Sequence, residues 1–405
     1  MSAVSIVKRR GKSVEATVRE AVELVGGLGA IVSRRSRVLV KPNLVKPIES
    51  GTGVITDCRV TEAVAKLALE EKPARVVIGE GSAYGYDVTG ARADTLEAFK
   101  RSGTDAVAER LGVDLVDLNR DEVVEVEVPG CYVMDTVKIA KTAYESDVII
   151  SLPVMKTHRR TIVTLSLKNM KGVMPSREKK KTHRLGLERA IIDLNTVVKP
   201  DFTVVDGLVG LGGLWTGEDA ENLDLILAGQ DPVAVDAVGA KVMGFDPAKI
   251  LKLELASERG LGTSDLGRIE VRGEAVESVA KRFLDPQKAF AERYPGVTLL
   301  DENACSACEG ELQSPLFYIR SAGCVDELEG LTVLIGVQRE APKVPKKTVV
   351  MGRCVEAFKD RGLYVPGCPP RGWALTAAIC EACGINKRVV AAAIERIHGS
   401  LNEIQ

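Results

Sequence analysis

Residues 37–44 read RVLVKPNL, a run of β-branched and aliphatic residues that stops at Pro42 and Asn43. A nearly continuous apolar run is typical of a strand that is buried on both faces of a parallel sheet. Residues 61–71 then carry apolar side chains at helical spacing, and Arg75–Ile78 is again a strand pattern. This succession of strand, helix and strand predicts a βαβ unit.

The same alternation continues along the chain. Further strand patterns lie at 114–118, 147–152 and 201–205, and a helical pattern covers 96–111. Strands separated by helices of about twelve residues indicate an α/β fold with a mostly parallel, doubly wound sheet. Glu122–Val128 differs, because charged and apolar residues alternate strictly there. This alternation predicts a half-exposed antiparallel strand, paired in a hairpin with Val133–Ile139.

A domain boundary is predicted near Asp285–Gly296, which gives an amino-terminal domain at 1–295 and a carboxy-terminal domain at 296–405. The second domain is a shorter α/β pattern. Its strands are expected at 297–300, 331–337, 348–351 and 364–365, and its last two helices at 373–383 and 387–397.

Composition excludes several classes of protein. The 405 residues carry 55 Lys and Arg against 56 Asp and Glu, a formal net charge of −1, which argues against a general nucleic-acid or polybasic membrane binder. Only 4% of residues are aromatic, so few side chains are available for stacking on bases. The longest apolar runs, such as Val389–Ile394, are too short to span a bilayer. No secretory signal is visible at the amino terminus, so a cytoplasmic location is expected.

Nine cysteines are distributed unevenly, with seven in the last quarter of the chain. Because structural disulfides are rare in a reducing compartment, such a group indicates metal binding or redox chemistry. Four of the seven follow three predicted strand ends, which meet at one edge of a parallel sheet. These four are Cys305, Cys308, Cys354 and Cys368. Four thiolates suit a 4Fe–4S cluster or a tetrahedral zinc ion, and inert buried thiols are the third alternative.

Three further cysteines, Cys324, Cys380 and Cys383, lie in the same domain. Three thiolates are an incomplete ligand set for a second cluster, so packing or a spare redox couple is the simpler interpretation. Cys58 and Cys131 are isolated in the sequence and are interpreted as structural.

The cysteine motifs resemble those of the cluster-carrying small subunits of nickel–iron hydrogenases and of respiratory NADH:quinone oxidoreductase, over residues 297–380. The matching elements are Cys-x-x-Cys-Glu at 305–309, Gly-x-Cys at 352–354 and Tyr-Val-Pro-Gly-Cys-Pro-Pro-Arg at 364–371. The resemblance implies a flavodoxin-like domain whose four matched cysteines hold one 4Fe–4S cluster. The stretch between the second and third ligands is shorter than in those subunits, which affects the expected number of strands.

Residues 156–184 contain ten Lys or Arg against one acidic residue, and both His158 and His183. Lys156 and His158 directly follow the strand at 147–152, where a doubly wound sheet has its ligand crevice. Lys168 and Asn169 lie nearby in the sequence and add a cation and an amide. The segment therefore predicts a small anionic ligand such as a phosphate or a carboxylate. For Arg177–Lys181, a solvated surface is an equally good interpretation.

Polar residues also end the other predicted strands: Lys41, Asn43, Thr56, Asp57, Glu80 and Asp206. The glycine-rich stretch 206–213 has neither the Gly-x-Gly-x-x-Gly order nor a Walker lysine, so neither nucleotide-binding fingerprint is met. Asp231 precedes Pro232 and is expected to cap a helix. Asp236 would lie on that helix and need a buried partner such as Lys41 or Lys156.

Most of residues 36–275 resemble the family called domain of unknown function 362. The matching elements are VKPNL at 40–44, GEGS at 79–82, PVMKTH at 153–158, LKNMKG at 167–172, DG at 206–207 and GQDPVAVD at 229–236. Members of that family are often joined to iron–sulfur modules. The cysteine module of this chain departs from the commoner ferredoxin-like run of closely spaced cysteines.

Together these features predict an iron–sulfur redox protein, with one 4Fe–4S cluster that exchanges electrons with a partner protein, and a crevice for a small anionic substrate or cofactor. Catalysis is assigned to His158, Lys156 and Asp206. Ligand binding is assigned to Lys168, Asn169, Lys41, Asn43, Asp57 and Glu80. The unperturbed pKa of histidine, near 6.5, suits His158 as a general acid or base.

Two alternatives stay open. A hydro-lyase or isomerase would use a cluster iron as Lewis acid, which requires an open coordination position and therefore three protein ligands. A pure electron-carrier subunit would need none of the polar groups of the amino-terminal domain.

Overall fold

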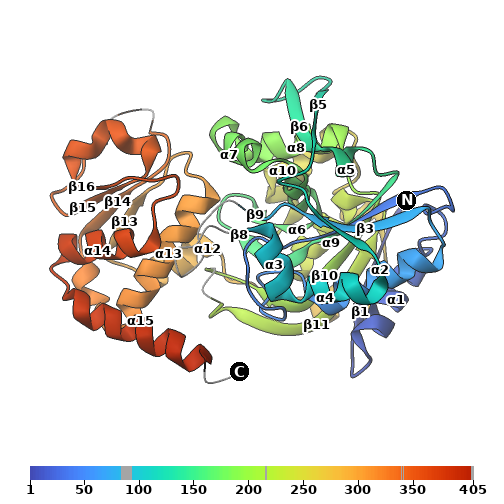
Figure 1. The fold of residues 1–405 in the computed structure, drawn as a ribbon, viewed down its shortest axis with the longest axis horizontal. Coiled ribbons are helices and arrows are strands. Elements are labelled where there is room, and N and C mark those ends of the chain that lie inside the picture. Colours follow the sequence, from blue (N-terminus) through green and yellow to red (C-terminus); the bar gives the residue numbers. More distant parts are fainter. Residues whose placement is uncertain (84–93, 215–216, 339, 341, 403–405) are drawn as a thin grey trace. The chain divides into compact units, whose positions relative to one another are not determined.

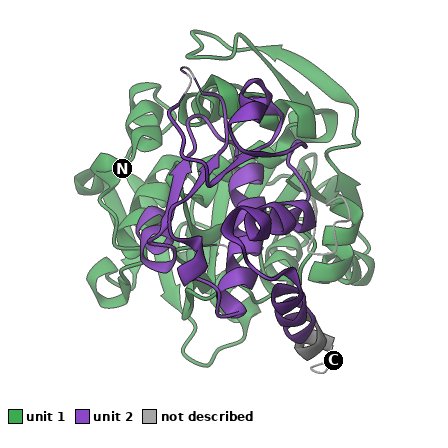
Figure 2. Ribbon diagram, turned by 90° about the vertical axis from the view of Figure 1, so that its left-hand side faces the viewer, with its two compact units in different colours: residues 1–83, 93–213, 217–286 green, residues 84–92, 214–216, 287–405 purple. Residues whose placement is uncertain are grey.

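The computed structural model describes residues 1–83, 94–214, 217–338, 340 and 342–402 (Figure 1). The chain divides into two compact units (Figure 2). Unit 1 comprises residues 1–83, 93–213 and 217–286, and unit 2 is built mainly from residues 287–405. The division at residue 286 lies inside the segment 285–296, where the sequence pattern changes.

Unit 1 is built on one large sheet with the strand order β12-β1-β11-β10-β7-β2-β3-β4. Its strands are β1 (Ser2–Lys8), β2 (Arg37–Pro42), β3 (Arg75–Glu80), β4 (Asp114–Asp117), β7 (Val148–Leu152), β10 (Phe202–Leu211), β11 (Ala220–Gly229) and β12 (Ile269–Gly273), with β8 (Val154–His158) and β9 (Ile162–Val163) at the side of β10. The five strands from β10 to β4 are parallel, whereas β11 is antiparallel to both of its neighbours. The predicted α/β fold with a mostly parallel sheet is confirmed.

The strand order places a topological switch point between β2 and β7. From β2 the chain proceeds through β3 to β4 in one direction, and from β7 to β10 in the other. β2 and β7 are parallel and in register from Val38 opposite Val148 to Pro42 opposite Leu152. Ligands of such sheets bind outside the carboxyl ends of the strands at this point.

Helices cover both faces of the sheet, and β2 shows how its residues divide between them. Val38 and Val40 pack in the cluster formed with α1 (Val14–Leu24), α2 (Cys58–Glu70) and α4 (Thr104–Leu111). Leu39 packs on the other face, in the cluster that includes α8 (Leu187–Val197). Since side chains alternate along a strand, Lys41 lies on the same face as Leu39.

The remaining helices of unit 1 are short. They are α3 (Thr95–Ser102), α5 (Lys141–Tyr144), α6 (Leu165–Asn169), α7 (Ser176–Leu185), α9 (Pro232–Val242), α10 (Leu251–Glu258) and α11 (Val276–Val279). The predicted hairpin is confirmed, because β5 (Val123–Glu127) and β6 (Thr136–Ala140) form an antiparallel pair. The prediction of a single helix at 96–111 is wrong, because Gly103, at φ +75°, ends α3 and separates it from α4.

Two other predictions need correction. The strand predicted at 201–205 does not end at Asp206, because β10 continues through the glycine-rich stretch to Leu211 and pairs there with β11. The strands β1, β11 and β12 did not emerge from the sequence pattern, although β1 lies inside the sheet between the other two.

Unit 2 contains a second, smaller sheet of four parallel strands. They are β13 (Val297–Leu300), β14 (Leu331–Leu334), β15 (Thr348–Met351) and β16 (Leu363–Val365). Its helices are α12 (Pro286–Arg293), α13 (Ser306–Ser321), α14 (Gly372–Cys383) and α15 (Lys387–Asn402). The described strands lie in chain order, which differs from the 2-1-3-4-5 order of flavodoxin. Without its outer strand 2, the flavodoxin order leaves four neighbouring strands in chain order, so unit 2 fits the smaller parallel α/β domain that the sequence predicted.

The fold predicts a stability effect at Asp231, which caps α9 as the sequence indicated. One carboxylate oxygen accepts bonds from the backbone N–H groups of Val233 (2.9 Å) and Ala234 (3.0 Å). The other accepts from the Ser2 hydroxyl (2.7 Å) and the Thr263 N–H (3.0 Å). Asp231→Ala should lower the free energy of unfolding by about 2 kcal/mol, measured by urea denaturation. Asp231→Asn keeps a capping oxygen and should lose less. An unchanged urea midpoint in the Ala variant would contradict this role.

Candidate functional site

A buried ion pair lies at the carboxyl ends of β2 and β3. Lys41 is 0% exposed, and its Nζ donates to Glu80 Oε2 at 2.9 Å, to the carbonyl of Pro42 at 3.1 Å and to Asn169 Oδ1 at 3.3 Å. Burial lowers the pKa of Lys41, and the neighbouring carboxylate of Glu80 opposes that shift. Three elements, β2, β3 and α6, are thereby joined at one polar centre.

Asn43 and Lys156 extend this centre toward β8. Asn43 Nδ2 donates to Asn169 Oδ1 at 2.8 Å, and Lys156 Nζ donates to Asn43 Oδ1 at 2.7 Å. The structure therefore brings five of the predicted site residues, including Lys41 and Glu80, into one hydrogen-bonded network, here called the lysine network. The pKa of Lys156 is held well below its usual value by burial and by the charges of Lys168 and further lysines.

Two glycines make the close packing around this network possible. A Cβ atom on Gly172 would overlap Glu80 and Lys41, and one on Gly81 would lie only 2.6 Å from the carbonyl oxygen of Gly172. A side chain at Gly172 would displace the ion pair, and one at Gly81 would displace the backbone of Gly172 or the ammonium group of Lys179. Gly172, the last residue of the LKNMKG element, thus packs directly against the ion pair.

Lys179 is a site residue that the sequence did not single out. It lies on α7 and is only 9% exposed, with its Nζ bonded to the carbonyl of Gly81 (2.5 Å) and to Asn119 Oδ1 (2.9 Å). Burial lowers its pKa to about 7, with Glu80 opposing the shift. The solvated surface considered for 177–181 therefore does not include this residue. No sequence pattern marked Lys179, because its burial is visible only in the structure, where Thr182, one helical turn later, is also buried.

His158 ends β8 and is buried. Its Nδ1 accepts hydrogen bonds from the backbone N–H groups of Arg160 (3.2 Å) and Thr161 (3.3 Å), so the neutral ring carries its proton on Nε2. Burial, followed by the charges of Lys168 and His183, holds the pKa of His158 well below the usual value. The unperturbed pKa assumed from the sequence is therefore wrong for this ring, which is neutral at pH 7.

A second imidazole lies close to His158. His183 Nε2 is 2.9 Å from Lys171 Nζ, and burial together with the charges of Lys171 and Lys168 lowers the pKa of His183 as well. Because an ammonium group can only donate, His183 Nε2 is the acceptor. The half-buried Lys168 acts on both rings and on Lys156, so the predicted anion-binding cations do share one region.

Asp57 and Asp206 form a separate pair of carboxylates. Asp206 Oδ2 accepts the backbone N–H of Asp57 at 2.7 Å, and Oδ1 accepts that of Leu208 at 3.0 Å. Asp57 caps α2 through the N–H of Arg59 (2.9 Å) and also binds the Arg59 guanidinium. Burial raises the pKa of Asp206 to about 7, and the charge of Asp57 adds to that shift. These side chains fix the backbone beside the network.

The prediction that Asp236 pairs with Lys41 or Lys156 is wrong. Its carboxylate accepts the N–H of Ser166 at 2.6 Å and lies 3.6 Å from Lys252 Nζ, not beside Lys41 or Lys156. Lys252 also donates to the carbonyls of Val163 (2.7 Å) and Thr164 (2.9 Å). The buried pair of Asp236 and Lys252 thus holds the backbone that leads into α6, the helix that carries Lys168 and Asn169.

In unit 2, three of the predicted ligand cysteines act electrostatically on the fourth, Cys308. Cys305 precedes α13 and Cys308 lies in its first turn, whereas Cys354 follows β15 and Cys368 follows β16. A hydrogen bond with Cys305, burial and the charges of Cys354 and Cys368 raise the pKa of Cys308. All four sulfur atoms therefore lie within electrostatic reach of one another.

Glycine turns shape the two loops that carry Cys354 and Cys368. Gly352 has φ +96° and Gly367 has φ +145°, values that disfavour residues with side chains. The Gly352 N–H donates to the carbonyl of Val365 (2.9 Å), and the Arg353 N–H donates to that of Gly367 (3.0 Å). These bonds tie the two loops together and bring their cysteines to one place.

The donor set suits a metal cluster chemically. The raised pKa of Cys308 keeps this thiol protonated without a metal, and ligation would release that proton. Across the described ranges, no three His, Cys, Asp or Glu side chains are arranged as ligands of one metal ion. No disulfide joins any of the nine cysteines, all of which lie in the described part of the chain.

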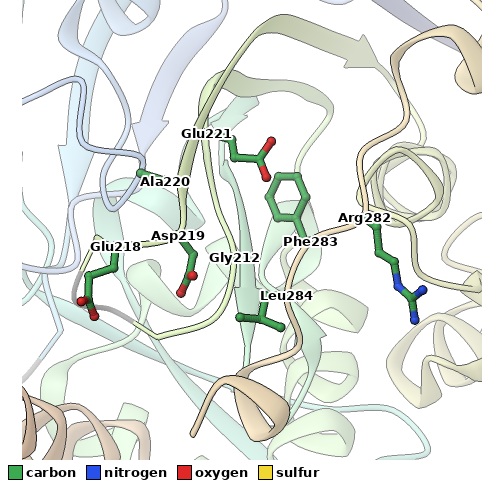
Figure 3. A pocket seen from close by; sticks show the side chains of 8 residues that line it. All are labelled: Gly212, Glu218, Asp219, Ala220, Glu221, Arg282, Phe283 and Leu284. Atoms are coloured by element: carbon green, nitrogen blue, oxygen red, sulfur yellow. The ribbon is translucent and has the colours of Figure 1, made fainter. Parts of the chain in front are cut away.

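A surface pocket of about 240 Å³ lies elsewhere on unit 1 (Figure 3). It is lined by Gly212, Glu218, Asp219, Ala220, Glu221, Arg282, Phe283 and Leu284. Three of the lining residues are acidic, so the pocket is opposite in charge to the lysine network. None of the predicted site residues lines the pocket. The predicted anion site is therefore not this pocket.

The raised pKa of Asp206 predicts how stability varies with pH. Between the unfolded pKa of 3.8 and the folded pKa of about 7, the unfolded chain has released a proton that the folded chain still holds. Raising the pH through this window should therefore destabilise the fold, by at most about 1.4 kcal/mol per pH unit, with no further loss above pH 7.

Asp206→Asn should remove this contribution, so the variant should gain stability relative to the unmodified chain as pH rises from 5 to 7. Urea denaturation at pH 5, 6, 7 and 8 measures the difference, and the exposed Asp114→Asn serves as control. Equal pH slopes for Asp206→Asn and the unmodified chain would contradict the assignment.

Comparison with known proteins shows similarity to one family model and to two individual proteins. The chain is 27% identical over 263 residues to the Thylakoid-associated protein sll1697 of Synechocystis sp., covering 62% of this chain and 76% of that protein. The lactate racemase apoprotein from Thermoanaerobacterium thermosaccharolyticum matches with a TM-score of 0.39 and 13% identity, over 88% of this chain and 72% of that one. Among the described residues, no helix is long and apolar enough to cross a membrane. The lysine network, formed by Lys41, Asn43, Glu80, Lys156 and Asn169, lies within residues 38–241. The family model described as Domain of unknown function (DUF362) matches these residues, which are half of the sequence, so the chain belongs to this family.

Proposed function

We propose that this protein is an iron–sulfur redox protein, in which unit 2 holds one 4Fe–4S cluster and exchanges electrons with a partner protein. The observation that carries the proposal is the meeting of four thiols from three loops at strand ends. Their sequence positions are Cys305, Cys308, Cys354 and Cys368. Cys305, Cys354 and Cys368 all act on the buried Cys308, which supports a shared site for the four.

The chain's own residues would shape the site as follows. Cys308 is buried and would shield one side of the group, while Cys354 is exposed and lies on the solvent side. The hydrogen-bonded glycine turns hold two ligand loops at fixed spacing. When bound, a 4Fe–4S cluster supplies one-electron transfer. Four ligands rather than three favour electron transfer over Lewis-acid chemistry, which needs an open coordination position.

Unit 1 is proposed to bind a small anion beside the lysine network. The charge of Lys168 lowers the pKa of Lys156, His158 and His183, and the positive potential that these shifts report supports an anionic ligand. Neutral His158, whose Nε2 carries the proton while Nδ1 accepts two backbone N–H groups, would act toward the bound molecule as a hydrogen-bond donor through Nε2. The compartment proposed is the cytoplasm, because its reducing conditions suit cysteines that form no disulfide among the described residues.

The cluster proposal predicts the effect of Cys354→Ser. Protein purified without oxygen should contain about four iron and four sulfide per chain and give an electron paramagnetic resonance signal after reduction. Cys354→Ser should lose most of both, because one of four ligands is removed. Cys131→Ser is the matched control, since Cys131 is exposed in unit 1 and should keep full iron and sulfide. A colourless protein that contains zinc, or an iron content unchanged in Cys354→Ser, would overturn the proposal.

The anion proposal is tested with inorganic phosphate as the probe. Phosphate at about one hundred times its dissociation constant should stabilise the folded chain by about 2.7 kcal/mol, seen as a rise in the thermal midpoint. Lys168→Ala should reduce that rise, whereas Lys249→Ala, an exposed lysine of unit 1, should not. A rise of equal size in all three proteins would contradict the site, and a small dicarboxylate used in parallel distinguishes the two anion classes.

A further inference from the structure

Unit 2 contains a second group of thiols, separate from the four described above. Cys380 and Cys383 lie in the last turn of α14, and Cys324 lies just after α13. Cys380 is 1% exposed, whereas Cys383 and Cys324 are partly exposed. Charges on Cys383 and on Cys324 both act on Cys380, so the three sulfur atoms are neighbours.

Helix geometry places Cys380 and Cys383 within disulfide range. Residues three apart lie on one face of a helix, and the rise and radius of an α-helix give about 5 Å between their Cα atoms. Disulfides join Cα atoms that are about 4.4 to 6.8 Å apart. The helix ends at Gly384, whose N–H bonds to the carbonyls of Cys380 and Glu381, so the pair lies in the least constrained turn.

Lys347 distinguishes the two thiols. Its Nζ donates to the carbonyls of Glu327 and Glu329, both at 2.6 Å, and forms a further hydrogen bond with Cys383. Burial raises the pKa of Cys383, and the ammonium group of Lys347 opposes that shift by favouring the thiolate, which is the nucleophilic form. Cys383 combines this partner with partial exposure, whereas Cys380 is buried behind it. The arrangement is that of an attacking thiol and a resolving thiol.

We propose that Cys380 and Cys383 form a reversible dithiol–disulfide couple that reacts with low-molecular-weight disulfides. The Cys383 thiolate attacks one sulfur of the small disulfide, whose S–S bond breaks, and the second sulfur leaves with the electron pair and takes up a proton. Cys380 then loses its proton, attacks the Cys383 sulfur and releases the second small thiol. Two protein thiols are oxidised and one disulfide is reduced, and the two protons end on the two released thiols.

This couple does not depend on the cluster proposal. Its two sulfur atoms belong to neither ligand loop, and its chemistry transfers two electrons per event. Cys324 is the neighbouring thiol that could compete for Cys380, so any test must identify which pair forms. The reaction can be followed by mass alone, with no activity assay.

The test uses the full chain, purified without oxygen and equilibrated with mixtures of reduced and oxidised glutathione. After alkylation of the remaining thiols, peptide mass spectrometry should show a Cys380–Cys383 disulfide that appears at one midpoint ratio of the two glutathione forms. Cys380→Ser should instead accumulate glutathione on Cys383, and Cys383→Ser should leave Cys380 reduced. Cys131→Ser, in unit 1, should behave as the unmodified chain does.

Lys347→Met should slow the first step several-fold, whereas Lys346→Met, which changes an exposed neighbour, should not. Three results would overturn the proposal: both thiols staying reduced at every ratio, a Cys324–Cys380 disulfide in place of the expected one, or a tightly held zinc ion that is lost in Cys380→Ser. Iron content measured on the same samples separates this outcome from that of the cluster. A loss of iron with the couple intact, or the reverse, would show that the two sites are independent.

Discussion

The arrangement of unit 1 depends on one constraint, the burial of the Lys41 ammonium group at the end of β2. A buried charge must be paired and hydrogen-bonded, and breaking such a pair costs about 3 to 5 kcal/mol. Glu80, at the end of β3, supplies the opposite charge, and Asn169 on α6 supplies a further acceptor. The polar side chains at the switch point are therefore structurally required as well as chemically available. Their positions can be rigid because each of them is needed by the others.

Both units use the same geometrical device for different chemistry. In each, side chains that end parallel strands meet at one edge of a sheet, as the topology of such sheets requires. Unit 1 gathers ammonium, amide and imidazole groups there, and unit 2 gathers thiols. The family to which the chain belongs accounts for residues 38–241 only, so the thiol-bearing unit lies outside the matched region.

Much of this could be predicted from local patterns, and the failures have a common cause. Apolar runs that end in polar residues located β2, β3, β7 and all four strands of unit 2, together with the polar residues that follow them. The pairing of Asp236 with Lys252, the burial of Lys179 and the strands at the far edge of the large sheet were missed. Each depends on contacts between segments that are distant in the sequence, which no local pattern records. The pKa of His158 was misjudged for the same reason, since it follows from burial and neighbouring charges.

The position of β1 has a consequence for synthesis of the chain. β1 leaves the ribosome before the other strands of unit 1, yet its two neighbours are β11 and β12, of which the second ends at Gly273. At about 5 to 20 residues per second, β1 waits roughly 13 to 53 seconds for both of its edges to be covered. During that time its apolar residues Val4 and Ile6, which are buried in the finished protein, lack their partners. A nascent chain of this kind is a natural client for chaperones that act at the ribosome.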